Sequence, residues 1–375
     1  MIKHFQIEKH IKTDKTLKLL KLNLNFVAEN RKLKNTNKKL ENTINLSPKN
    51  RLLKSLIFYG QNEVGKSQIF EDLKNFRDFI TNGTLKSDFF NASLRFFTKI
   101  DMDLIETEIN INFKNGKILK EELFIFNQNR KTRIFLRKEQ KFYFNQKFSN
   151  ETLRHFSKFI NQNELFISKI AQNQFFQTSE KFKIFFAIYN YIKNDFIFDN
   201  SDKLSKNIFV ENYDLFLEFI KLANLNINQF ENPYEFYEDL QKASSGTKEF
   251  VLTLAKIFQC QNSGQTLFLD DFAKNLHPNL AKFLVKIIHS SKNLQVLITS
   301  NCTSILDTKL FRIAQINFLD FDDYGSFLNK RLFDFKDFRE NMNAEKRYLQ
   351  GRFSATPFII VSENTIGKLL ERIRG

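Results

Sequence analysis

Residues 60–67 read Gly60-Gln61-Asn62-Glu63-Val64-Gly65-Lys66-Ser67 and match the pattern G-x-x-x-x-G-K-[ST] at every fixed position. Glycines in such a loop let the backbone curl so that successive N–H groups face a phosphate, and the next helix adds its dipole. Lys66 would reach the β- and γ-phosphates of a nucleotide, and the Ser67 hydroxyl would bind Mg²⁺. We therefore expect residues 60–67, with Gln68 next in the chain, to hold a nucleoside triphosphate.

The residues on either side predict the local structure that this loop needs. Leu52–Tyr59 is a compact apolar run that ends at Gly60, as a buried strand would. From Lys66 onward, apolar residues recur at helical spacing, namely Ile69, Phe70, Leu73, Phe76 and Ile80. A strand, a glycine loop and a helix thus follow one another, which is the context of a phosphate-binding loop.

The C-terminal part of the chain alternates between helical and strand patterns. We expect helices over 250–258 and 280–289 and strands at Thr266–Leu269, Leu294–Thr299 and, as a closing hairpin, Ile313–Phe321 and Ser326–Phe333. Such alternation predicts an α/β fold with a mixed, largely parallel sheet flanked by helices.

Other patterns precede this part. Residues 2–7 and 17–27 predict strands, and the basic, amide-rich residues 28–50 predict a solvated loop. Three further strands are expected at Ile105–Phe113, Glu121–Phe126 and Thr132–Leu136, with a hairpin turn at Lys114-Asn115-Gly116. Residues 151–241 have helical periodicity, with Phe-rich faces that indicate core: Phe182, Phe185, Phe186, Tyr189 and Ile192, then Leu215, Phe216, Phe219, Ile220 and Ala223.

These patterns divide the chain in two. Residues 1–81 and 243–375 would form one discontinuous nucleotide-binding domain. Residues 82–242 would form an insertion that is first rich in strands and then helical.

The composition of the chain indicates which partners and which cellular compartment to expect. The 58 basic and 42 acidic residues give a net charge of +16, which suits a nucleic-acid surface but also follows from codon bias toward Lys, since no stretch interleaves the charge with aromatics. Two cysteines form no disulfide framework or metal spacing, and no apolar run resembles a signal peptide or a membrane span. We expect a cytoplasmic protein without membrane contact.

Two acids end the strand at Thr266–Leu269. A metal-bound nucleotide needs a carboxylate at the end of a neighbouring strand, and Asp270 would hold Mg²⁺ there while Asp271 would polarise the attacking water. Strand ends are often acidic, so this interpretation depends on the phosphate-binding loop.

A small, hydroxyl-rich helix start lies about two dozen residues earlier, at Ala243-Ser244-Ser245-Gly246-Thr247-Lys248. Its N–H groups and hydroxyls suit a γ-phosphate. The alternative is an ordinary N-cap by Ser or Thr.

Together these motifs resemble the ABC-class AAA ATPases, a group that includes the OLD and SMC ATPases. The loop, Ser-Ser-Gly-Thr, the acidic strand end, Leu276-His277-Pro278 and a strand ending in Thr299 carry the resemblance. Residues 164–172 and Tyr348-Leu349-Gln350-Gly351-Arg352-Phe353 look like segments of the bacterial abortive-infection branch.

The resemblance implies ATP and Mg²⁺ as the bound pair and a composite site in a homodimer. Each ATP would lie between one loop and Ser244, Ser245 and Gly246 of the partner chain, and either serine could meet the γ-phosphate. His277 would belong to the loop that crosses the dimer interface, or would simply begin a helix. The family ATPase is often encoded beside a separate effector protein, and the resemblance to the abortive-infection branch implies a role in defence against phage.

Two residues depart from the family pattern. Asp271 stands where the family usually has Glu, and Asn301 stands where it usually has His. Asn301 can form hydrogen bonds but cannot take up a proton as an imidazole does, so we expect dimerisation with slow turnover. The alternatives are a DNA-repair or chromosome-maintenance ATPase, for which residues 82–242 lack heptads, and a nucleotide-binding scaffold with weak hydrolysis.

Overall fold

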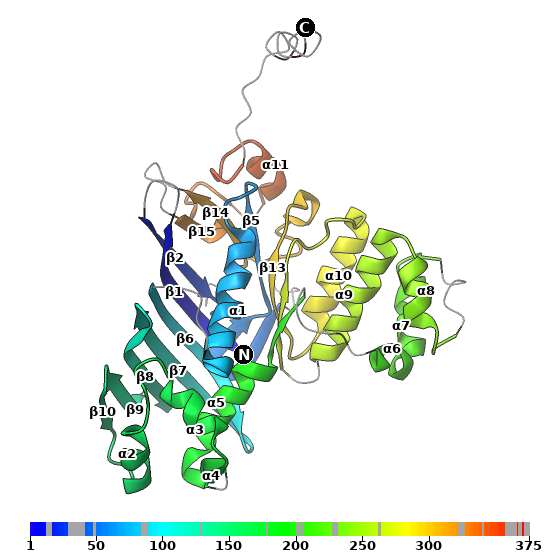
Figure 1. Ribbon diagram of the computed structural model, residues 1–375. Helices are drawn as coiled ribbons and strands as arrows, with labels where there is room; N and C mark the ends of the chain where they lie inside the picture. The colour runs from blue at the N-terminus through cyan, green and yellow to red at the C-terminus, as the bar shows by residue number, and fades with distance from the viewer. Residues whose placement is uncertain are drawn as a thin grey trace.

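The chain forms two large sheets with helices between and beside them (Figure 1). The structure is a computed structural model. It describes residues 1–12, 17–28, 42–47, 50–83, 89–127, 130–177, 179–199, 204, 206–226, 232–261, 264–321, 327–339, 341–356, 366 and 370. The turn predicted at 322–325 lies outside them.

One sheet has six strands in the order β11-β12-β13-β5-β14-β15. The first five strands are parallel and β15 is antiparallel to β14, so the predicted α/β fold with a mixed, largely parallel sheet is confirmed. Their bounds are Phe196–Phe198, Thr266–Leu269, Gln295–Thr299, Ser55–Gly60, Ile316–Phe321 and Phe327–Arg331.

Strand β5 is buried along its whole length and separates two cores. Leu56 and Phe58 pack into one core while Ile57 and Tyr59 pack into the other, because successive side chains of a strand point to opposite faces. Helix α1 (Lys66–Asn82) covers the first face, and α9 (Ser245–Gln261) and α10 (Pro278–Ser290) cover the second (Figure 1).

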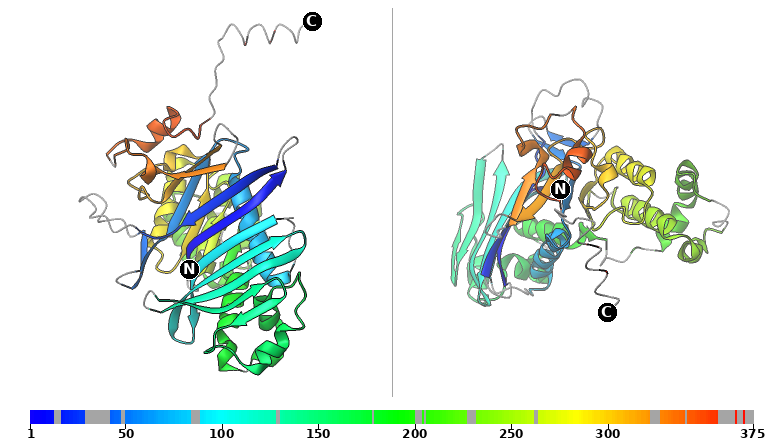
Figure 2. Two further views of the ribbon diagram at one scale, coloured as in Figure 1. Left: turned by 90° about the vertical axis from the view of Figure 1, so that its left-hand side faces the viewer. Right: turned by 90° about the horizontal axis from the view of Figure 1, so that it is seen from above.

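The other sheet is antiparallel, in the order β10-β9-β8-β7-β6-β1-β2. Helix α1 lies between the two sheets, as the view from above shows (Figure 2): Phe76 meets Phe5 of β1 and Phe70 meets Phe268 of β12, with ring centroids 5.3 and 6.0 Å apart. The strand bounds are Lys141–Phe144, Arg130–Lys138, Lys117–Asn127, Asp103–Lys114, Phe89–Ile100, Ile2–Lys12 and Leu17–Asn25.

This sheet crosses the expected boundary at residue 82. Strand β6, which the sequence patterns did not indicate, pairs with β1 and so joins the middle strands to the N-terminal hairpin. Strand β11, inside the stretch predicted to be helical, pairs with β12 because Phe196 and Phe198 pack around Phe268. The division into 1–81 with 243–375 and 82–242 stays a prediction, and it coincides with the edge of neither sheet.

Of two predicted connections, the hairpin turn at 114–116 is confirmed and the loop at 28–50 is partly wrong. The hairpin turn between β7 and β8 is present, with Asn115 and Gly116 at φ of 49° and 76°. The loop expected over 28–50 is wrong for β3 (Thr43–Ser47), which pairs with β4 (Asn50–Leu53) because Ile44 and Leu52 are buried opposite each other. Residues 29–41 and 48–49 lie outside the described part.

Two groups of short helices complete the fold. In the first group, α3 (Phe166–Gln172) and α5 (Lys183–Asn194) pack on α1, and α5 also contacts β6. The 3-10 turn η2 (Glu180–Phe182) leads into α5, and α4 (Gln174–Gln177) contacts α3. Helix α2 (Glu151–Ser157) packs on α3 and α4 through Phe156. The second packs on α9: α6 (Asn207–Glu211), α7 (Tyr213–Leu222) and α8 (Phe236–Lys242). The Phe-rich faces are core in both groups, except that Leu215 is exposed.

The C-terminal region adds η3 (Thr303–Ile305), η4 (Leu332–Asp334) and α11 (Ala344–Leu349). No helix in the described ranges is long and apolar enough to cross a membrane.

Candidate functional site

The loop of residues 60–67 lies where β5 ends and α1 begins. A Cβ atom on Gly60 would come within 2.7 Å of Val64 Cγ1 and 2.9 Å of the Leu319 carbonyl oxygen, so only glycine fits there. Glu63 and Gly65 have φ of 66° and 99°, which curl the chain into the first turn of α1. Asn62, Glu63 and Ser67 are exposed around this turn.

Lys66 folds back over the loop. Its Nζ donates to the carbonyl oxygens of Gly60 and Gln61 at 2.7 and 2.8 Å. Burial lowers the pKa of Lys66, while the nearby carboxylates Asp271 and Asp270 act in the opposite direction. No side chain caps the start of α1 and no acid stands in its first turn, which leaves the helix N-terminus suited to a phosphate.

Gln68 is held differently from the loop before it. Its side-chain amide donates to Asp72 Oδ1 at 2.9 Å, and Asp72 also pairs with Lys9 of β1. The predicted contact of Gln68 with a nucleotide would therefore involve its backbone N–H.

Asp270 is oriented by strand β13. Thr299 Oγ1 donates to Asp270 Oδ1 at 2.5 Å, and the backbone N–H of Asp271 donates to the same oxygen at 3.1 Å. Asp270 and Ser67 face a common cavity of about 70 Å³. The oxygen atoms of these two side chains are ligands that Mg²⁺ prefers.

The donor set fits a nucleotide-bound Mg²⁺ better than a protein-bound cation. The described residues contain no group of three or more metal-ligating side chains. Mg²⁺ commonly takes one or two protein ligands and completes its octahedron with phosphate oxygens and water.

The two residues that depart from the family pattern lie against each other. Asn301 Nδ2 donates to Asp271 Oδ1 at 3.0 Å, and Lys274 Nζ lies 3.3 Å from Oδ2. Asp271 has a φ of 50°, which places its backbone in the left-handed region. The turn after β12 is thus strained, and the carboxylate it presents is oriented by an amide rather than an imidazole.

Ser244, Ser245 and Gly246 stand at the start of α9. The Ser244 hydroxyl accepts the backbone N–H of Thr247 at 3.2 Å, as an N-cap does, and donates to Thr247 Oγ1 at 3.0 Å. Ser245 is exposed. Gly246 packs tightly, because a Cβ there would lie 3.0 Å from the carbonyl oxygen of Asn275.

His277 caps α10. Its Nδ1 accepts the backbone N–H of Asn279 at 3.2 Å, with Pro278 in the first turn, which is the helix-start role that the sequence left open. A further role of His277 at a dimer interface stays a prediction.

The tail motif touches the site, which its sequence did not reveal. Gln61 Nε2 donates to the Thr356 carbonyl oxygen at 3.0 Å, and Thr303 Oγ1 donates to Glu345 Oε1 at 2.8 Å. Tyr348 packs on Tyr59, with ring centroids 5.8 Å apart. The segment 344–356 therefore contacts both the phosphate-binding loop and the loop that follows Asn301.

Asp199 is a second residue that sequence patterns missed. It follows the three-residue strand β11 and lines the cavity that Ser67 and Asp270 share. Its carboxylate pairs with Lys256 of α9. A strand so short has no recognisable periodicity, so only pairing with β12 reveals this acid.

A glycine loop at the carboxyl end of a central parallel strand, with acids at the end of a neighbouring strand, defines a P-loop nucleotide-binding protein. A family model described as "AAA domain, putative AbiEii toxin, Type IV TA system" matches residues 55–301. The chain belongs to this family of AAA ATP-binding domains.

Solved structures give distant similarities. An SMC head bound to the C-winged helix domain of ScpA is 11% identical, covering 88% of this chain and 98% of its own, with a TM-score of 0.38. The ADP conformation of an ATP-binding cassette of an ABC transporter is 12% identical, covering 93% and 96%, with a TM-score of 0.33. No curated protein matches the chain.

Proposed function

We propose that the protein is an Mg-ATP-binding and ATP-hydrolysing switch that dimerises around ATP. Each ATP would lie between residues 60–67 of one chain and Ser244–Gly246 of the other. When bound, ATP supplies the cleavable phosphoanhydride and Mg²⁺ offsets the charge of its phosphates. This chain contributes the loop that holds the phosphates, the Ser67 and Asp270 oxygens for the cation, and Asp271 for the water.

The observation that carries this proposal is that the described residues show no polar contact between the start of α9 and the loop of residues 60–67. Lys66, Asp270 and Asp271 interact at one edge of the sheet. Within the described ranges, no hydrogen bond or ion pair joins Ser244–Gly246 to residues 60–67. An exposed helix start rich in hydroxyls, without such a contact to its own loop, suits the nucleotide of a partner.

The structure also favours Ser245 over Ser244 as the γ-phosphate donor. Both serines are exposed, but the Ser244 hydroxyl is used within its own chain to cap α9. A phosphate there would meet the Ser245 hydroxyl and the positive end of the helix dipole.

Turnover is proposed to be slow. Asp271 is one methylene shorter than the glutamate usual in the family, and Asn301 orients it without taking up a proton. The same pair favours a second candidate function, a nucleotide-binding scaffold in which ATP closes the dimer and is hardly hydrolysed.

The biological role is proposed to be cytoplasmic defence against phage or other foreign nucleic acid, together with a separate effector. The family description, which names a putative AbiEii toxin of a type IV toxin–antitoxin system, supports this setting. Closure and reopening of the dimer would act on the effector.

Lys66→Ala tests the proposed function. Removing the cation that contacts the β- and γ-phosphates should abolish ATP binding, measured by calorimetry with Mg²⁺, and turnover, measured as phosphate release. Lys286→Ala, which removes an exposed lysine of α10, is the control and should bind ATP normally. Equal ATP affinity of a folded Lys66→Ala variant would overturn the proposal, and binding without turnover by the native chain would favour the scaffold.

A further inference from the structure

Charged side chains on the open face of the antiparallel sheet are mostly paired. Lys3 and Arg95 share Glu106, Lys131 pairs with Glu108, and Arg133 and Lys120 share Glu122. These three acids offset much of the basic charge of the five cations around them.

The far end of this sheet is different. Strand β10 forms its edge, and helix α2 runs beside it. Lys138, Lys141, Arg154 and Lys158 are exposed there, and no ion pair of the described residues involves any of the four. The acids that line the hollows at this end are Glu139 and Glu151, so the region keeps an excess of positive charge.

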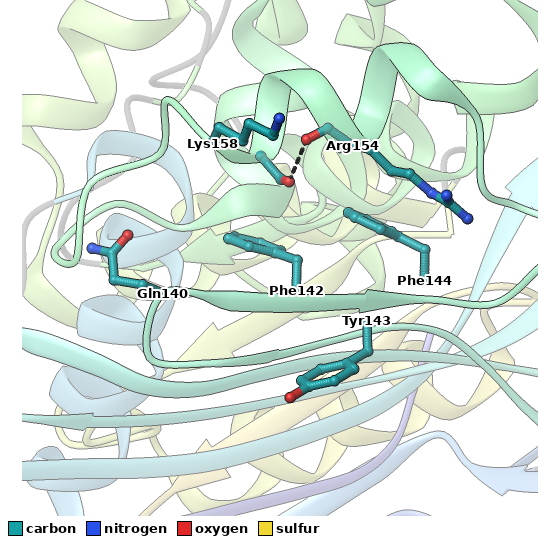
Figure 3. Close-up of a pocket in the computed structure, with 7 residues that line it drawn as sticks. Gln140, Phe142, Tyr143, Phe144, Arg154 and Lys158 are labelled. Atoms are coloured by element: carbon teal, nitrogen blue, oxygen red, sulfur yellow. Dashed lines mark hydrogen bonds between the residues drawn. The ribbon is translucent and has the colours of Figure 1, made fainter.

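The same end is hollowed and lined with aromatic rings. A groove of about 530 Å³ lies between β10 and α2, with Phe142 and Phe144 on its floor and Arg154 and Lys158 on its α2 side (Figure 3). Tyr143 points to the opposite face of the strand, where a second hollow of about 530 Å³ contains Lys138 and Lys141.

Exposed rings continue beyond these hollows. Tyr143 is 52% exposed, and Phe159 and Phe175, near α2 and in α4, are 68% and 70% exposed. His155 and Phe159 stand one helical turn apart, with ring centroids 5.4 Å apart, and both line a third hollow together with Phe175. Cations and accessible rings thus alternate around β10 and α2.

We propose that this surface, defined by Lys138, Lys141, Tyr143, Arg154, Lys158 and Phe159, binds single-stranded nucleic acid. Lysine and arginine would neutralise successive phosphates, and the exposed rings would stack on bases, which is how proteins hold single strands without reading sequence. An acidic peptide would satisfy the cations but would leave the rings without a partner. The surface extends the proposed ATPase function by naming a partner, and it does not depend on ATP.

Binding of a fluorescently labelled oligothymidine to the full chain, measured by anisotropy without nucleotide, tests the proposal. Lys138→Glu with Lys141→Glu should weaken binding about tenfold or more and flatten its salt dependence, because each lost phosphate contact removes about one counterion from the salt slope. Tyr143→Ala should weaken binding about fivefold or more, and Tyr143→Phe, which keeps the ring, should not.

The control makes the same charge change at another site. Lys221→Glu with Lys286→Glu reverses two exposed lysines on α7 and α10, at the opposite side of the molecule, and should leave oligothymidine binding within about twofold (Figure 1). Equal losses in both double variants would show that only net charge matters and would overturn the proposal. So would binding of phosphatidylserine vesicles or polyglutamate in place of the oligonucleotide.

ATP binding keeps the two proposals distinguishable. The β10 variants should bind Mg-ATP as the native chain does, since none of these residues contacts residues 60–67. Loss of oligothymidine binding with ATP binding intact would support the proposed nucleic-acid surface. Oligothymidine binding that is unchanged in every variant would overturn that proposal and would leave the proposed ATPase function standing.

Discussion

At the scale of single residues, we propose that Asp271 and Asn301 limit the rate of ATP hydrolysis. The amide donates to the carboxylate at 3.0 Å and thereby fixes its direction. An imidazole at position 301 could also carry a proton, and a glutamate at position 271 would extend the carboxylate by one methylene. Positioned general acids and bases typically contribute about 10²- to 10⁴-fold to a rate, so either departure is enough to slow turnover.

Replacing both residues should therefore raise turnover. We expect Asp271→Glu with Asn301→His to increase phosphate release about tenfold or more, while the affinity for ATP changes little. Each single variant serves as a control, because an imidazole without the longer acid, or the reverse, should recover less. An unchanged rate in a folded double variant would assign the slow step to something other than this pair.

The two serines at the start of α9 should have different roles, Ser244 in stability and Ser245 in ATP-induced dimerisation. Ser244→Ala removes an N-cap and should lower the free energy of unfolding by about 1 kcal/mol, measured with urea, because the Thr247 N–H loses its acceptor. Ser245→Ala should leave stability unchanged and weaken ATP-induced dimerisation, measured by light scattering. The reverse assignment would show that Ser244 meets the γ-phosphate.

At the scale of elements, loops on neighbouring strands are tied together by segment 344–356. Gln61 donates to Thr356 and Thr303 donates to Glu345, so the tail contacts the loops after β5 and β13. The rings of Tyr348 and Phe353 hold this segment in place by stacking on Phe318, with ring centroids 5.6 and 4.6 Å from that of Phe318.

Removing the hydrogen bond from Gln61 to Thr356 should weaken ATP binding. Gln61→Ala removes a hydrogen bond of about 1 kcal/mol that restrains the phosphate-binding loop, and we expect ATP affinity to fall about threefold to tenfold in calorimetry. Gln350→Ala, at an exposed position of the same tail, is the control and should bind ATP normally. Equal affinity in both variants would mean that the loop holds its shape without the tail.

Sequence patterns predicted the elements that have strong local signals. Strand β12 occurs over the expected residues, because it is a short apolar run that ends in two acids. Helix α1 begins at Lys66 as expected, because a long amphipathic helix has clear periodicity. Strands β6, β10 and β11 went unrecognised. Strand β6 pairs with β1, which is distant in sequence, β11 has three residues, and β10 is an edge strand of four residues, none of them buried. Likewise Asp199 and Thr356 join the site only through tertiary packing.

At the scale of the whole molecule, helix α1 unites the structure. It begins at the nucleotide loop and packs between the two sheets through Phe70, Phe76 and Phe79. The antiparallel sheet carries the β10–α2 surface at its far end (Figure 1). Helix α1 thus connects the proposed nucleotide site to the sheet that we propose to hold nucleic acid.

The composite site is the central claim, and mixing two variants tests it most directly. Lys66→Ala lacks a working loop, and Ser245→Glu places a carboxylate where the γ-phosphate of the partner should lie, at a helix start that tolerates acids. Neither variant alone should form an ATP-dependent dimer.

A mixture restores one intact site per heterodimer, from the loop of the Ser245→Glu chain and the α9 start of the Lys66→Ala chain. We predict that ATP with Mg²⁺ converts the mixture, and neither variant alone, to twice the monomer mass in light scattering. A mixture that stays monomeric, while the native chain dimerises and the Ser245→Glu chain still binds ATP, would contradict the composite site.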